Sequence, residues 1–105
     1  MLQVMSENFK EAIASNVPTL VDFYTTWCGP CQQMHPILEE LKSKIGNKAR
    51  ILKINVEQNM RVAAEYQIRN VPTLMIFKNG QPVWRQVGVQ SVSTLESAID
   101  AAVNS

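Results

Sequence analysis

The chain has 105 residues, of which 46% are hydrophobic and 18% charged, and its formal net charge is +1. A chain of this size can bury its own core, so we expect a single domain over residues 1–105 that folds without a disulfide. Its charges are spread singly, which argues against nucleic-acid or membrane partners, and nothing resembles a secretion signal or a membrane span. We therefore expect a cytoplasmic protein, and a monomer because no extended apolar repeat requires a partner.

The first elements are a helix and a strand. Ser6 can cap a helix of about ten residues that carries Phe9, Ala12 and Ile13 on one face and ends before Pro18. The run TLVDFY at 19–24 is short and apolar, which is typical of a buried strand.

A long amphipathic helix follows and ends at Gly46. Pro36 lies inside it and should kink it, because the ring removes a backbone donor and clashes with the carbonyl of Gln32. The apolar residues recur at helical spacing: Met34, Ile37, Leu38, Leu41 and Ile45.

The second half of the chain alternates in the same way. ILKINV at 51–56 predicts a strand and residues 59–66 a short helix, and TLMIFKNG at 73–80 ends in a turn pair that favours a hairpin into 83–88. The last helix begins near Ser91 and should bury Leu95, Ile99, Ala102 and Val103. Apolar strands separated by helices predict a three-layer α/β domain whose mixed sheet has four or five strands and is covered on both faces.

The only two cysteines lie in WCGPC, as Cys28 and Cys31. A structural disulfide is one interpretation, but closing so short a loop stabilises a fold by only about 2 kcal/mol, and such bonds are unusual in a reducing compartment. A zinc site is a second, with His35 and Glu39 as further ligands, although residues on one helix start cannot surround a metal tetrahedrally. His35 by itself is typical of an ordinary helix surface.

A redox pair is the third interpretation, and the position of the motif favours it. Cys28 lies between a strand and the first turn of a helix, where unpaired N–H groups and the helix dipole stabilise a thiolate. Pro30 suits the first turn, since its missing N–H would have no partner there.

Two charged residues interrupt the apolar strands. Asp22 lies within TLVDFY and Lys53 within ILKINV. Each could lie at an exposed end or edge of its strand. A buried Asp22, six residues before Cys28, would instead have a raised pKa and be placed to act as a general base.

Together, VDFYTTWCGPC, KINVEQN, VPTLMIFKNG and Gly88 resemble the thioredoxin family over about residues 4–103. The resemblance implies the thioredoxin fold, with a central mixed sheet of five strands flanked by four helices. It implies that Cys28 attacks a client disulfide and that Cys31 resolves the mixed disulfide. Asp22 would accept the proton of the resolving thiol, with Lys53 beside it.

The resemblance also implies a client-binding surface around Cys28. Val71-Pro72 would carry a cis peptide bond, although only about 5–6% of X-Pro bonds are cis, and Val71 would offer its backbone to the client. The remaining docking residues would be Trp27, Gly29, Pro30, Gly88 and Val89. Gln32, Gln67 and Asn70 depart from the usual family residues. Because Gln67 and Asn70 precede Val71-Pro72, it is open whether this loop matches that of the family.

The implied activity is that of a protein-disulfide reductase that binds no cofactor or metal itself. Its electrons would come from NADPH through thioredoxin reductase, and its clients would include proteins such as peroxiredoxins. A redox-independent binding subunit of a larger assembly and a dedicated reductant of one client pathway are the alternatives. Gly-Pro between the cysteines favours the reductase, because oxidases and isomerases of this fold usually carry a histidine there.

Overall fold

The computed structural model of the chain describes residues 2–3 and 8–105. Its elements, in chain order, are β1 (Leu2–Gln3), α1 (Phe9–Ile13), β2 (Thr19–Tyr24), α2 (Gly29–Ile45), β3 (Arg50–Asn55), the 3-10 turn η2 (Val56–Gln58), α3 (Met60–Glu65), β4 (Thr73–Lys78), β5 (Gln81–Val87) and α4 (Val92–Val103).

The strands form one five-stranded sheet in the order β1-β3-β2-β4-β5. Strands β1, β3 and β2 are parallel, whereas β4 runs antiparallel to both β2 and β5. Because β1 contributes only two residues, four strands of six or seven residues make up most of the sheet. The predicted α/β fold with a mixed sheet and four α-helices is confirmed.

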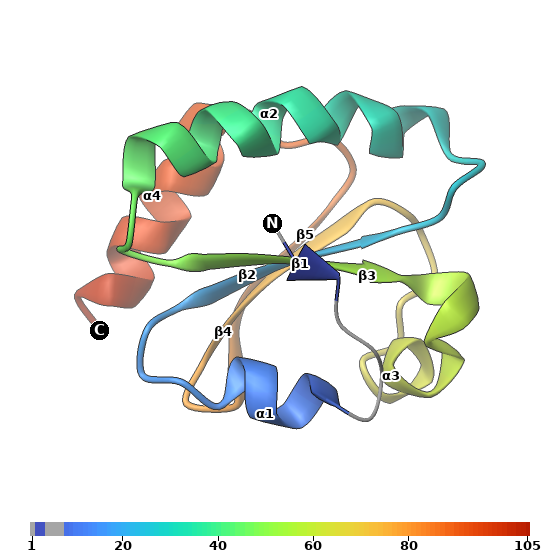
Figure 1. The fold of residues 1–105 in the computed structure, drawn as a ribbon, viewed down its shortest axis with the longest axis horizontal. Coiled ribbons are helices and arrows are strands. Elements are labelled where there is room, and N and C mark those ends of the chain that lie inside the picture. Colours follow the sequence, from blue (N-terminus) through green and yellow to red (C-terminus); the bar gives the residue numbers. More distant parts are fainter. Residues whose placement is uncertain (1, 4–7) are drawn as a thin grey trace.

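Helices cover both faces of the sheet, as Figure 1 shows, with α2 and α4 on one face and α1 and α3 on the other. Each face has its own hydrophobic core, because alternate residues of a strand point to opposite sides. The α2 and α4 side contains Leu20, Met34, Leu38, Leu41, Leu74, Ile76, Leu95 and Ile99. The α1 and α3 side contains Phe9, Ile13, Val21, Phe23, Ile54, Val62, Met75 and Phe77.

Helix α2 begins directly after Cys28, whose extended backbone and side-chain acceptor make it the N-cap. Pro30 lies in the first turn, and the helix continues through Pro36 to Ile45. Gly46 ends it with φ of 55°, a backbone conformation that glycine adopts without steric cost. The sequence therefore fixes both ends of the helix that carries the cysteine pair.

Some predicted details are wrong. Helix α1 has five residues rather than about ten, and its predicted cap, Ser6, lies outside the described residues. Val103 is 40% exposed because it lies on the outer face at the end of α4. Strand β5 is mostly exposed, since it forms a sheet edge and has a neighbour on one side only.

Within the part of the chain that is described, no helix has the length and apolar character needed to cross a membrane.

Candidate active site

The two cysteines form a disulfide at the N-terminus of α2. Their Cα atoms are 5.2 Å apart, and the backbone N–H of Cys31 donates to the Sγ of Cys28 at 3.1 Å. Cys31 is only 6% exposed, whereas Cys28 is half-buried. The first cysteine is therefore the more accessible, and the helix end supplies an N–H group that can stabilise its thiolate.

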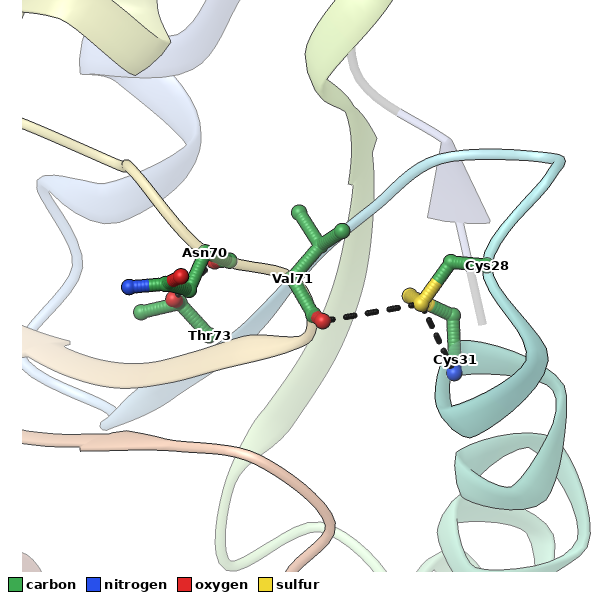
Figure 2. The surroundings of a disulfide bond; sticks show 5 residues. All are labelled: Cys28, Cys31, Asn70, Val71 and Thr73. Atoms are coloured by element: carbon green, nitrogen blue, oxygen red, sulfur yellow. Dashed lines mark hydrogen bonds between the residues drawn. A yellow bond between two sulfur atoms is a disulfide. The ribbon is translucent and has the colours of Figure 1, made fainter.

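The loop before β4 faces this pair across the site, as Figure 2 shows. The carbonyl oxygen of Val71 lies 3.5 Å from the Sγ of Cys28, and the Val71-Pro72 bond is cis, as the family resemblance implied. On either side of Val71, the hydroxyl of Thr73 donates to the Asn70 carbonyl at 2.6 Å and the N–H of Gly88 donates to the Pro72 carbonyl at 2.8 Å. This loop is thus anchored on both sides of the residue that meets Cys28.

Asp22 and Lys53 are neighbours in the sheet, because β2 and β3 pair Asp22 with Lys53. Asp22 is 1% exposed on a central strand, and its Oδ1 has no hydrogen-bond partner among residues 2–3 and 8–105. Burial raises the pKa of Asp22 from 3.8 to about 6, and the nearby positive charge of Lys53 offsets part of that rise. Neither residue lies at an exposed edge: Lys53 is half-buried, with its Nζ 4.5 Å from the ring centre of Tyr24.

The other predicted docking residues lie at or near the protein surface. Trp27 is 89% exposed and Val89 40%, Gly29 and Pro30 are exposed, and Val71 and Gly88 are half-buried. Sequence reasoning did not find Gln90, whose side-chain amide donates to the carbonyls of Val87 and Gly88, each at 3.2 Å. No local sequence pattern predicts these two hydrogen bonds to backbone carbonyls.

Gln67 adopts φ of 53°, a left-handed conformation that is unfavourable for a residue with a side chain. This explains why glycine would suit the position. The guanidinium of Arg85, on β5, donates to the carbonyls of Tyr66 and Gln67 and holds the turn. Arg85 was also missed, because it is distant in sequence from the turn.

A cavity of about 370 Å³ lies beside Cys31, between the start of α2, the end of β2 with the loop after it, and Lys53 of β3. It was not predicted, because its walls come from three separate segments. No group of three His, Cys, Asp or Glu side chains that could hold a metal ion occurs in the described ranges. The residues that line the cavity are Tyr24, Thr25, Thr26, Cys31, Gln32, His35 and Lys53.

Comparison with known proteins agrees with this geometry. The family model for thioredoxin matches residues 1–101. A thioredoxin-like protein of Synechocystis sp. is 49% identical over 84% of this chain and 85% of its own. A thioredoxin of Staphylococcus haemolyticus is 44% identical over 95% of each chain. A mutant thioredoxin from Halobacterium salinarum superposes with a TM-score of 0.88 at 35% identity, over 97% of this chain and 89% of its own.

The WCGPC cysteines, their position at a helix N-terminus and the family match lead to one conclusion. The chain belongs to the thioredoxin family and is a thiol-disulfide oxidoreductase of the protein-disulfide reductase type, with Cys28 and Cys31 as its redox pair.

Proposed function

We propose that the first step is attack by the Cys28 thiolate on a client disulfide. One client sulfur bonds to Cys28 and the other leaves as a thiolate. The observation that carries this proposal is the position of Cys28 at the start of α2, where it is more accessible than Cys31 and its sulfur lies 3.5 Å from the Val71 carbonyl. A client strand placed against Val71 would bring its disulfide to that sulfur.

In the second step, Cys31 loses its proton and attacks the Sγ of Cys28. The Cys28–Cys31 disulfide forms, the second client thiolate leaves, and the client has gained two electrons. Asp22 is the proposed proton acceptor, because a carboxylate whose pKa is about 6 is a far stronger base than an exposed one. Lys53 is proposed to limit that rise in pKa, and Pro72 to shape the loop that presents Val71.

Clients are proposed to dock on the surface made by Trp27, Gly29, Pro30, Val71, Gly88 and Val89. The apolar side chains of this group suit partners that are not selected by charge, in keeping with the net charge of +1. Disulfide-containing proteins, such as peroxiredoxins, and thioredoxin reductase are the expected partners of the 1–105 domain. Electron supply from NADPH through that reductase, the absence of a bound cofactor, a monomeric state and a cytoplasmic location remain predictions.

The test is reduction of a protein disulfide, such as those of insulin, by the wild type and by Cys28→Ser and Cys31→Ser variants, with NADPH and thioredoxin reductase. We expect both variants to lose catalytic turnover and the wild type to be active. A protein that served only as a binding subunit would retain its role in the Cys28→Ser variant. The reduction potential of the pair provides a second check, because a reductase should be clearly more reducing than the glutathione pool.

A further inference from the structure

His35 lies one helical turn after Cys31 on α2 and lines the same cavity. Residues at i and i+4 are neighbours on a helix surface, with Cβ atoms about 5–6 Å apart. The imidazole and the resolving cysteine therefore border one space, although His35 is exposed while Cys31 is buried. A cavity of about 370 Å³ can hold several waters, each of which needs only about 30 Å³.

Glu39, a further turn along the helix, orients this imidazole. The Nε2 of His35 lies 3.2 Å from the Oε1 of Glu39. This contact involves Nε2, so Nδ1 is the ring nitrogen that it leaves available.

The other groups around the cavity are poor proton acceptors. The Lys53 ammonium, from β3, has three donors and no acceptor, and a phenol such as that of Tyr24, from β2, is a much weaker base than imidazole. Thr25, Thr26 and Gln32 do not titrate. Asp22 is buried beside Lys53 on the neighbouring strand and is not among the residues that line the cavity. Among the described residues that line the cavity, His35 alone carries an imidazole, the side chain that most often acts as a general base in proteins.

We propose that His35, held by Glu39, accepts the proton of the Cys31 thiol through water in this cavity, in parallel with Asp22, when the mixed disulfide is resolved. The proton passes from Cys31 to His35 and then to solvent, the Cys31 thiolate attacks Cys28, and the client sulfur leaves with the electron pair of the broken bond. The inference rests on the proposed function, because it concerns the second step of that reaction.

The experiment is a stopped-flow reaction of excess reduced protein with dithiobis(nitrobenzoate), an aromatic disulfide that releases one coloured thiolate at each step. The first release reports attack by Cys28 and the second reports resolution by Cys31. For His35→Gln we expect an unchanged first phase and a second phase slowed by about tenfold near neutral pH, less than the 10²–10⁴-fold expected for a sole general base because Asp22 remains. The slowing should vary with pH, because a general base acts only while it is unprotonated, whereas the loss of a purely structural contact would slow the phase equally at every pH.

Three variants separate this role from others. Glu39→Gln should slow the second phase less than His35→Gln. Glu40→Gln breaks a comparable pair on α2, to Lys44, away from the cavity, and should leave both phases unchanged. Free imidazole should restore the second phase of His35→Ala, which a purely structural role would not allow.

The inference is overturned if His35→Gln leaves the rate of the second phase unaltered from pH 5.5 to 9, or alters it equally at every pH. A wild type that lacks the second phase would instead refute the proposed function.

Discussion

Replacing Asp22 with Asn should remove a strong dependence of stability on pH. Burial raises the pKa of Asp22 from 3.8 to about 6, so the folded protein binds this proton more tightly than the unfolded chain does. The contribution of Asp22 to the free energy of unfolding is therefore most favourable below its unfolded pKa, and it falls as pH rises from about 4 to about 6. At about 1.36 kcal/mol per pKa unit, the loss of unfolding free energy is about 3 kcal/mol.

The assay is unfolding of the oxidised protein in guanidinium chloride, followed by circular dichroism between pH 3.5 and 8. Relative to the wild type, Asp22→Asn should gain about 3 kcal/mol of unfolding free energy across this range. Any effect of the amide on packing adds a constant that does not vary with pH. Asp100→Asn is the control, because Asp100 is only half-buried and its ion pair with Lys48 lies near the surface. An equal difference between wild type and Asp22→Asn at every pH would refute the reasoning.

Three further predictions follow from individual contacts. Cys31→Ser should trap a mixed disulfide between Cys28 and a client, detectable by mass spectrometry, since the resolving thiol is gone; failure to trap any client would contradict the proposed order of attack. Lys53→Met should raise the pH at which the loss of stability caused by Asp22 is half complete, because it removes the positive charge that lowers the pKa of Asp22 against the effect of burial. A shift to lower pH would exclude this role of Lys53. Gln67→Gly should raise the free energy of unfolding by about 0.5–1 kcal/mol, because glycine tolerates φ of 53°, whereas Gln67→Ala should give no gain.

Local patterns in the sequence predicted much of the fold. Strand β2 has the bounds of the run TLVDFY, and α2 ends where Gly46 follows the last apolar residue of the helical stripe. The predictions are less exact where the burial of a residue depends on tertiary contacts rather than on the local sequence pattern. The alternation of residues does not show that β5 is an edge strand, and the end of α4 leaves Val103 exposed.

The site shows a similar division. The redox pair was predicted because CxxC, the strand before it and the helix after it are contiguous in sequence. The cis bond at Val71-Pro72 came only from the family resemblance, since the residues by themselves favour a trans bond. Arg85 and Gln90 were missed because each acts through a backbone carbonyl, which any residue type can offer.

The sequence by itself determined the α/β fold, the position of Cys28 at a helix start and the family. The tertiary structure alone decided that Asp22 is buried with an unpartnered Oδ1 in the described chain, that Val71 faces Cys28, and that His35 shares a cavity with Cys31. The physical reason is that secondary structure follows from spacing over a few residues, whereas burial and electrostatics depend on groups from strands and helices far apart in sequence. For that reason the same histidine that reads as an ordinary surface residue in the sequence becomes a candidate proton acceptor in the fold.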